Sequence, residues 1–236
     1  MNDLIQHLIE WDREVTVSLN GSSSLFADNF AFLHTSPWIW VPLALAAIFI
    51  LIRNIPPKNL IYAFLAIILT VVICDQLSSG LCKPLFARFR PSRDILIIDA
   101  IDTVRGYRGG LYGFFSGHAA NSFGVAVLFA LFVRNWLLSV SMITWASLNA
   151  YIRVYLGVHF VGDILTGAVA GTLVAVFIYL LFRLLTDKGI VRYENSRLNR
   201  TLFTKSGFLL TDVTMVLIVL FATYSCILIG SCIASF

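Results

Sequence analysis

Three short blocks of the sequence carry residue types that bind anions and move protons. They are Lys83 with Arg90-Pro91, then Ser116-Gly117-His118, and then Arg153 with His159 and Asp163. Lysine and arginine supply countercharge, and an arginine can bind two oxygens of an anion at once. Serine and glycine at a helix N-terminus add free backbone N–H groups. The blocks therefore predict a site for an anionic group.

The third block also holds a pair suited to nucleophilic catalysis. His159 and Asp163 are four residues apart, so they share one face of a helix. A carboxylate there holds the imidazole in the tautomer whose other nitrogen is free to attack. His118 and His159 open two predicted helices beside the same cations. His7 and His34 have no such partners, and we interpret them as interfacial residues.

The elements that position these blocks are expected to be membrane helices. Of the 236 residues, 58% are hydrophobic and only 13% are charged, whereas soluble domains have roughly 25% charged residues. This composition excludes an ordinary soluble domain and a disordered chain. The four cysteines show no C-x-x-C spacing, so neither a disulfide scaffold nor a zinc motif is supported. The net charge of +4 does not indicate nucleic acid, because basic residues mark the cytoplasmic loops of membrane proteins.

Six apolar runs are long enough, or nearly so, to cross a bilayer. They cover residues 38–52, 60–79, 117–133, 136–151, 158–185 and 207–233. Backbone polar groups must be satisfied internally in hydrocarbon, so each run is expected to be a helix. The predicted fold is all-α: a polytopic membrane bundle of six transmembrane helices with an N-terminal amphipathic interfacial helix.

That N-terminal helix is predicted from residues 1–20. Apolar residues recur there at helical spacing, and the polar residues, Asp12 among them, occupy the other face. Residues 20–24 read as the turn that ends the helix. We expect one membrane domain over residues 1–236, with the catalytic core at 60–185. Residues 186–236 would form a basic loop and the last transmembrane helix.

The distribution of basic residues suggests an orientation. The loop at about residues 185–206 is basic and otherwise plain, as cytoplasmic loops are, so we place it in the cytoplasm. Both termini and residues 80–116 then face outward. That outward segment is dense in cations, namely Lys83, Arg88, Arg90, Arg93, Arg105 and Arg108. For Arg93, Arg105 and Arg108, contact with anionic headgroups is as good an interpretation as a role in the site.

Together the blocks resemble the type 2 phosphatidic acid phosphatase (PAP2) family, which shares its active site with the vanadium haloperoxidases. The family pattern is K-x6-R-P, then P-S-G-H, then S-R-x5-H-x3-D, and the resemblance covers about residues 60–185. Two positions depart from it, because Phe115 replaces the proline and Ile152 replaces the serine. The proline is not chemically required. The missing serine is expected to remove one hydroxyl from the phosphate pocket.

The resemblance implies a role for each matching residue. His159 would be the nucleophile that forms a phosphohistidine, Asp163 would orient it, and His118 would be the general acid and later the base. The phosphate-binding residues would be Lys83, Arg90, Ser116, Gly117 and Arg153. No metal or other cofactor is expected, because the nearby acids do not group as ligands and the cations already supply the charge. Asp75 is interpreted as a structural ion-pair partner of a pocket arginine.

The implied function is hydrolysis of a lipid phosphomonoester or diphosphate at the outer face of the cytoplasmic (inner) membrane, with the site facing the periplasm or exterior. The family accepts phosphatidate, phosphatidylglycerophosphate, polyprenyl diphosphates and lipid A phosphates. Our expectation leans towards undecaprenyl diphosphate or a related envelope lipid phosphate. The expected partners are this lipid substrate and anionic lipid headgroups, with no nucleic acid.

Two alternatives remain. A non-catalytic membrane protein that binds anionic lipids or carries a solute would use the same cations, but it would not explain the spacing of His159 and Asp163. A haloperoxidase would share the pocket, but that chemistry usually occurs in soluble proteins.

Overall fold

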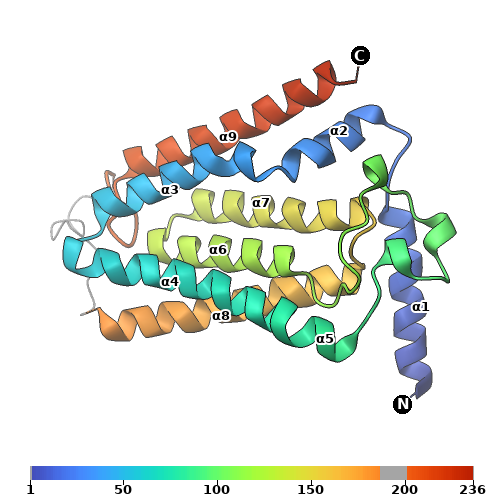
Figure 1. Ribbon diagram of the computed structural model, residues 1–236. Coiled ribbons are helices and arrows are strands. Elements are labelled where there is room, and N and C mark those ends of the chain that lie inside the picture. Colours follow the sequence, from blue (N-terminus) through green and yellow to red (C-terminus); the bar gives the residue numbers. More distant parts are fainter. Residues whose placement is uncertain (1, 187–200, 236) are drawn as a thin grey trace.

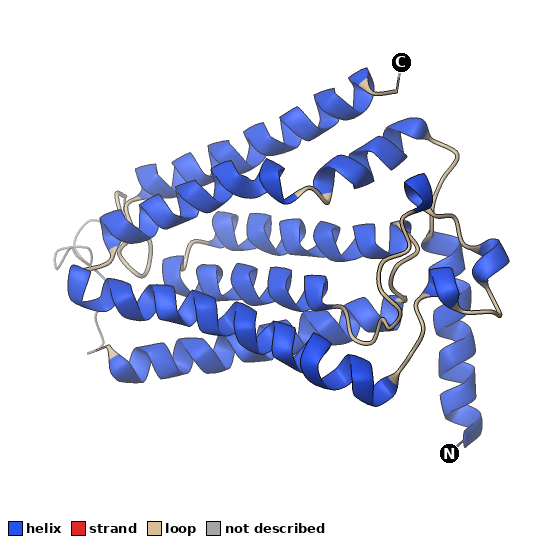
Figure 2. Ribbon diagram, viewed as in Figure 1, coloured by secondary structure: helices blue, strands red, loops and turns tan. Residues whose placement is uncertain are grey.

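The computed structural model describes residues 2–186 and 201–235. These residues form nine α-helices, joined by loops and by short 3₁₀ and π-helical turns, with no β-sheet among them (Figure 2). The all-α prediction is therefore confirmed. The expected basic loop falls largely on residues 187–200, which lie outside the described residues.

The helices form a bundle with one helix set across its end (Figure 1). Its central members are α6 (Gly117–Val133), α7 (Trp136–Tyr155) and α8 (Val161–Leu185), and α4 (Pro57–Asp75) packs against α6 and α8. Along one side, α2 (Leu25–His34) and α3 (Val41–Asn54) follow each other through a 3₁₀ turn and run beside α9 (Leu210–Ile233). The crosswise helix is α1 (Asn2–Leu19).

Four segments of the described chain are long and apolar enough to cross a membrane. They are Pro37–Asn54, Pro57–Phe86, Val161–Leu185 and Leu210–Ile233. Helix α6 is apolar but shorter, with 17 residues. The protein is thus an integral membrane protein. Helices occupy all six predicted runs, but among the described residues only these four segments reach the length and hydropathy of a membrane span, and the 20-residue helix α7 is not one of them. The bounds of α6 match its predicted run of 117–133.

Small residues bring α6 and α8 into close contact. At Gly171 an added Cβ would collide with the backbone carbonyl of Ala120, and at Gly167 it would lie 2.5 Å from the carbonyl oxygen of Ser116. Such small-residue contacts let helix backbones approach closely in membranes. The two helices run in the same direction, so their N-termini lie at the same end of the bundle (Figure 1).

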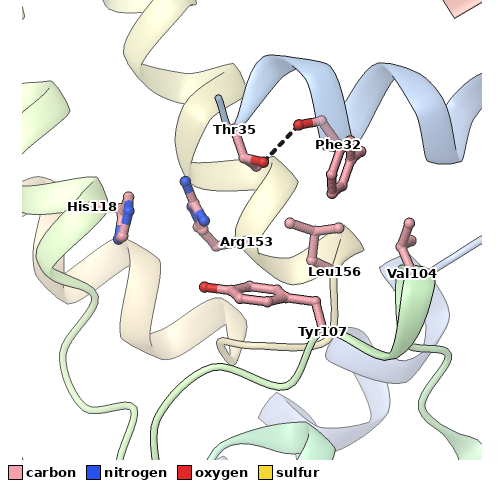
Figure 3. Close-up of a pocket in the computed structure, with 7 residues that line it drawn as sticks. All are labelled: Phe32, Thr35, Val104, Tyr107, His118, Arg153 and Leu156. Atoms are coloured by element: carbon pink, nitrogen blue, oxygen red, sulfur yellow. Dashed lines mark hydrogen bonds between the residues drawn. The ribbon is translucent and has the colours of Figure 1, made fainter. Parts of the chain in front are cut away.

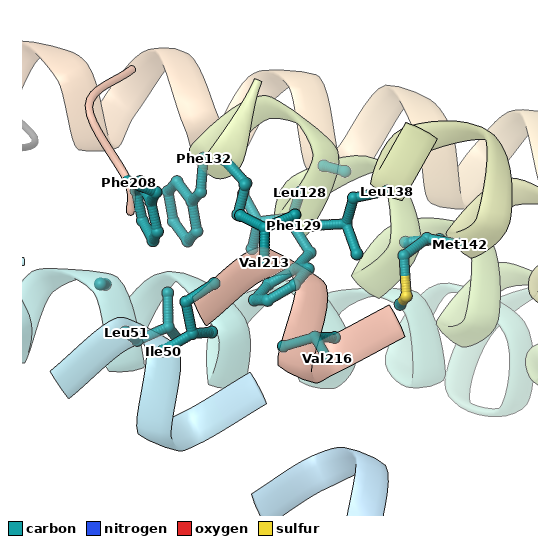
Figure 4. Packing of buried hydrophobic residues seen from close by; sticks show 14 of the residues in the cluster. Ile50, Leu51, Leu128, Phe129, Phe132, Leu138, Met142, Phe208, Val213 and Val216 are labelled. Atoms are coloured by element: carbon teal, nitrogen blue, oxygen red, sulfur yellow. The ribbon is translucent and has the colours of Figure 1, made fainter. Parts of the chain in front are cut away.

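The main hydrophobic cluster fills the opposite end. Figure 4 shows Ile50 and Leu51 of α3 with Phe132 of α6 and Val213 of α9, and all four are buried. The ring of Phe132 also lies 4.9 Å from that of Phe182 on α8, centroid to centroid. This apolar packing fixes the helices at one end and leaves the other end free for polar groups.

Three features at the site end differ from expectation. Helix α2 was not predicted, because its ten residues are too few to read as a membrane span. His34 is not interfacial but buried, with its ring 4.8 Å from that of Trp40. In α1, Leu4 and Leu8 are exposed, whereas Asp12 from the polar face is buried against the bundle.

Candidate active site

A cavity of about 230 Å³ opens at the end of the bundle where α6 and α8 begin. Its walls include five of the predicted catalytic and phosphate-binding residues, namely Lys83, Arg90, Gly117, His118 and His159. The loop before α6 supplies Arg90, and the N-terminus of α6 supplies Gly117 and His118. Residues far apart in the sequence therefore meet at one pocket, as the spacing of the blocks predicted.

The two cations of the first block are held by neighbouring groups. Lys83, at the start of the short helix α5 (Lys83–Phe86), donates from Nζ to Ser79 Oγ at 3.0 Å. Arg90 donates from Nε to the carbonyl of Tyr112 at 3.2 Å, and from Nη1 to that of Val158 at 3.0 Å. Burial lowers the pKa of Arg90, but arginine stays charged at neutral pH.

The expected ion pair of Asp75 is not observed. In the described part of the chain, Asp75 forms no ion pair with a pocket arginine. Its carboxylate instead accepts from Ser79 Oγ at 3.4 Å, and Ser79 in turn accepts from Lys83. Asp75 thus reaches the pocket cation through a hydroxyl.

His159 and Asp163 form the predicted pair. The Nδ1 atom of His159 lies 3.2 Å from Asp163 Oδ2, and the two residues are 1% and 0% exposed. His159 precedes α8 rather than lying within it, and Asp163 caps the start of that helix by accepting from the backbone N–H of Phe160 at 3.1 Å. The other imidazole nitrogen, Nε2, lies 3.2 Å from Arg90 Nη1. With Nδ1–H donating to Asp163, the Nε2 lone pair faces the cations.

Burial sets the protonation state of this histidine. It lowers the pKa of His159 to about 4, although the hydrogen bond and charge of Asp163 act in the opposite direction. The imidazole is therefore neutral, and able to attack, at every pH well above that value.

This protonation state predicts a pH dependence. The rate should fall on the acid side as His159 becomes protonated. In Asp163→Asn the carboxylate that raises the pKa of His159 is gone, so the acid limb of the remaining activity should move to lower pH. Both proteins should be assayed with one substrate, so that its own ionisation cancels. If the acid limb of Asp163→Asn lies at the same pH as in the wild type or at a higher one, the assignment of this limb to His159 is wrong.

The three residues of the second block lie together at the start of α6 but do not all line the cavity. Ser116 caps α6, because its Oγ accepts from the backbone N–H of Ala119 at 3.4 Å, and its side chain does not line the cavity. Gly117 does line it, and a Cβ there would lie 3.2 Å from Ser78 Oγ. His118 lines it as well and, among the described residues, has no hydrogen-bond partner. It is therefore free to act on a bound molecule.

Arg153 lies apart from the other cations. Its side chain is 6% exposed and lines an adjoining cavity that also includes His118 (Figure 3). Within the described residues its guanidinium makes no hydrogen bond, and Nε has no partner. Arg153 therefore lines the cavity that adjoins the first one at His118, and not the cavity lined by Lys83 and Arg90.

The two departures from the family pattern are accommodated by packing. Phe115 is buried beside Cys74 and Ala120, and its carbonyl accepts from Ser78 Oγ at 2.7 Å. Ile152 is buried in an apolar cluster with Tyr155 and lines neither cavity. The expectation that the serine replaced by Ile152 costs the phosphate pocket a hydroxyl is therefore not supported, because this position faces apolar neighbours.

Arg88 and Asp12 are functional candidates that sequence reasoning missed. Arg88 donates from Nη1 to Asp163 Oδ1 at 3.1 Å and from Nη2 to Asp12 Oδ2 at 2.7 Å. Asp12 also accepts from the backbone N–H of Gly162 at 2.8 Å. Both oxygens of Asp163 are thus held, and α1 is connected to the His159–Asp163 pair through Arg88 and Gly162. Arg88 appeared in the sequence only as one loop cation among several.

This network predicts that Arg88 is a positioning residue. In Arg88→Ala, kcat should fall by about tenfold to a hundredfold with little change in KM, since a charge-assisted hydrogen bond to Asp163 is lost. Arg88→Lys should recover part of the loss, because it keeps the charge but not the two-pronged geometry. The exposed Arg93 provides the control Arg93→Ala. A rise in KM with kcat unchanged in Arg88→Ala, or no recovery of kcat in Arg88→Lys, would refute the positioning role.

Gly113 lies against His159 and Asp163, and the sequence did not indicate it either. An added Cβ would lie 2.8 Å from Asp163 Oδ2 and 3.6 Å from His159 Nδ1. Asp163 cannot move away easily, because His159, Phe160 and Arg88 all hold it. A glycine in a loop carries no signal of such a contact in one sequence.

Gly113→Ala should therefore lower kcat although it removes no functional group. We expect a loss of about 100-fold, the scale on which small misplacements of reacting groups act. Gly110→Ala is the matched control, because its Cβ would meet only Arg90 Nη2 at 4.0 Å. Phosphate release by both purified variants checks the prediction, and equal rates for the two would contradict it.

Among the described residues, no three His, Cys, Asp or Glu side chains lie together in a way that could hold a metal ion. The positive charge in the pocket comes from Lys83 and Arg90, and Arg153 lines the adjoining cavity.

The chain shows clear similarity to known proteins. Residues 59–187 match the sequence model of the PAP2 superfamily. A lipid A 4′-phosphatase of Porphyromonas gingivalis is 39% identical over 178 residues, which cover 75% of this chain and 75% of that protein. A lipid A 4′-phosphatase of Bacteroides thetaiotaomicron is 40% identical over 170 residues, which cover 71% of this chain and 75% of that one.

Two solved structures share the fold. The crystal structure of the PAP2-type phosphatidylglycerolphosphate phosphatase from Bacillus subtilis superposes with a TM-score of 0.57 and 21% identity, over 78% of this chain and 89% of that one. The crystal structure of Aquifex aeolicus LpxE gives a TM-score of 0.51 and 26% identity, over 70% of this chain and 92% of that one.

Proposed function

Because the chain belongs to the PAP2 superfamily, we propose that this membrane phosphatase removes the 4′-phosphate of lipid A. The observation that carries the proposal is the identity of 39% and 40% to two lipid A 4′-phosphatases. Of the substrates compatible with the sequence, these relatives favour lipid A over undecaprenyl diphosphate, which the sequence alone placed first.

The pocket supports a two-step mechanism. The substrate phosphate binds between Lys83 and Arg90 at the N-terminus of α6, where cations and backbone N–H groups stabilise charge on its oxygens. The lone pair on His159 Nε2 attacks phosphorus, and the bond from phosphorus to the sugar oxygen breaks. His118 gives its proton to that oxygen, and Asp163 stabilises the charge that develops on His159.

The second step regenerates the enzyme. His118, now neutral, takes a proton from water, and the water oxygen attacks the phosphorus of the phosphohistidine. The bond to Nε2 breaks, inorganic phosphate leaves, and His118 is again protonated. The protein, the substrate and one water molecule supply every group in this cycle, so we propose that the reaction needs no metal.

The proposed membrane arrangement has six crossings, formed by α2–α3 together, α4, α6, α7, α8 and α9. The exposed apolar side chains of α1, including Leu8 and Trp11, would rest in the interface beside the site. Arg53, Lys58 and Arg134 lie at helix ends away from the site, which supports a cytoplasmic location for that end. The site would then face outward from the inner membrane. We take the chain as one domain, with its catalytic core at residues 60–185.

A substrate panel tests the proposal. Purified protein in detergent would receive lipid A, phosphatidylglycerophosphate, phosphatidate and undecaprenyl diphosphate, with and without EDTA. We expect lipid A to have the highest kcat/KM, EDTA to have no effect, and mass spectrometry to locate the loss at the 4′ position. Preference for another lipid would refute the substrate. No release from any lipid by folded protein would favour a non-catalytic lipid-binding or transport protein.

A further inference from the structure

We call the cavity lined by Lys83, Arg90 and His159 the phosphate cavity. A second cavity shares His118 with it. It has a volume of about 250 Å³. Its other walls come from α2, from the loop before α6 and from the end of α7, and comprise Phe32, Thr35, Val104, Tyr107, Arg153 and Leu156 (Figure 3). The mechanism above leaves this space without a role.

Arg153 gives the second cavity a cation without a partner. Its guanidinium is buried, and Nε makes no hydrogen bond within the described residues. A buried charge without a partner is costly, so an anionic ligand would stabilise it. Arg153 and His118 stand next to each other in Figure 3. A phosphate bound beside His118 would therefore be shared between the two cavities.

The leaving group must also lie beside His118. This histidine gives its proton to the oxygen that departs, and an in-line attack by His159 sends that oxygen away from Nε2. His118 lines two cavities, and His159 lines only one of them. The second cavity is the one that His159 does not line. The part of the substrate bonded to the phosphate is thus directed into it.

The walls of this cavity suit a ring that carries hydroxyl groups. Figure 3 shows the hydroxyl end of Tyr107 turned towards His118 and Arg153. Thr35 donates its hydroxyl proton to the carbonyl of Phe32 at 2.8 Å, so its lone pairs are free to accept from a ligand. Aromatic faces with a few placed polar groups are typical of small-molecule sites.

The aromatic wall is held in place without a ligand. The guanidinium of Arg105 lies 4.1 Å from the ring centroid of Phe32, and it donates to Asn29 Oδ1 at 2.9 Å. Arg105 thus clamps the loop before α6 to α2. Such preorganisation lowers the cost of ordering the site when a ligand binds.

We propose that the second cavity is the leaving-group subsite, which binds the sugar ring that carries the phosphate. This inference rests on the proposed function. Phe32 and Thr35 lie outside the matched residues 59–187, so this part of the subsite lies outside the segment that carries the catalytic motifs. The subsite would make the protein prefer a sugar phosphate to other phosphate esters.

The test compares lipid A with p-nitrophenyl phosphate, which has no sugar. Phe32→Ala removes the aromatic wall, and Tyr107→Phe removes one hydroxyl while keeping the ring. For each variant, the ratio of kcat/KM for lipid A to that for p-nitrophenyl phosphate should fall about tenfold, the effect of one lost interaction. Phe26→Ala, on the same helix but away from the cavity, is the matched control and should keep the wild-type ratio.

The outcomes separate the two proposals. Wild-type protein that hydrolyses p-nitrophenyl phosphate but not lipid A would overturn the proposed function and the sugar subsite with it. Wild-type turnover of lipid A with an unchanged ratio in both variants would overturn the subsite alone. Equal losses on the two substrates would also overturn it, because the residues would then support the fold or the phosphate site rather than the sugar.

Discussion

Replacement of His159 by alanine is expected to lower phosphate release from lipid A by roughly 10⁴-fold or more, as removal of a nucleophile does in other covalent mechanisms. The Nε2 atom of His159 faces the pocket cations, and its other nitrogen is fixed by Asp163. Among the described residues, His118 is the one other histidine that lines the phosphate cavity, and the mechanism uses it as acid and base.

Two further proteins make the result interpretable. His7→Ala changes an exposed histidine, with a side chain 80% accessible, and should keep full activity. His159→Gln retains a polar side chain that can donate to Asp163, so a folded but inactive His159→Gln shows that the loss is chemical rather than structural. Activity within tenfold of wild type in either His159 variant would contradict the nucleophilic role.

The second large effect is expected at His118 and should depend on the leaving group. With lipid A as substrate, the rate of phosphate release by His118→Ala should be lower by roughly 10²–10⁴-fold, the usual contribution of a general acid or base. With p-nitrophenyl phosphate the departing oxygen needs no proton, so phosphorylation of His159 should persist. The variant should then release one equivalent of p-nitrophenol in a burst and turn over slowly afterwards, because no base activates the water.

Stopped-flow absorbance measures that burst directly. The wild type should show a smaller burst, since its second step is not slowed. Equal losses on the two substrates with no burst would show that His118 binds substrate instead of transferring protons. His7→Ala again serves as the control for a change of one histidine.

Much of the fold follows from local signals in the sequence. Residues 117–133 form α6 because an apolar run is capped at its start by Ser116, and Asn135 caps α7 in the same way. The contact between His159 and Asp163 spans four residues, so their spacing predicts the pair, although His159 precedes α8 and does not lie on its face. The three motif blocks meet because α6 and α8 start at the same end of the bundle.

The remainder depends on contacts between distant residues, which a single sequence does not reveal. Arg88 lies 76 residues from Asp12 and 75 from Asp163, so no spacing connects them. Asp12 looks like one polar residue on an amphipathic helix, yet it is buried in the site. Ile152 replaces a serine of the family pattern and was expected to cost the phosphate pocket one hydroxyl, but its side chain packs among apolar residues. Each error came from assigning a residue by its neighbours in sequence instead of its neighbours in space.

The nucleophilic role of His159 can be tested by finding the residue that receives the phosphoryl group. Wild-type protein would be mixed with lipid A labelled with ³²P in its 4′-phosphate, quenched in alkali within the first turnover, and digested for peptide mapping. We expect an alkali-stable, acid-labile label on the peptide that contains His159, and none in His159→Ala. Label on another residue, or loss of the 4′-phosphate by His159→Ala at the wild-type rate, would contradict it.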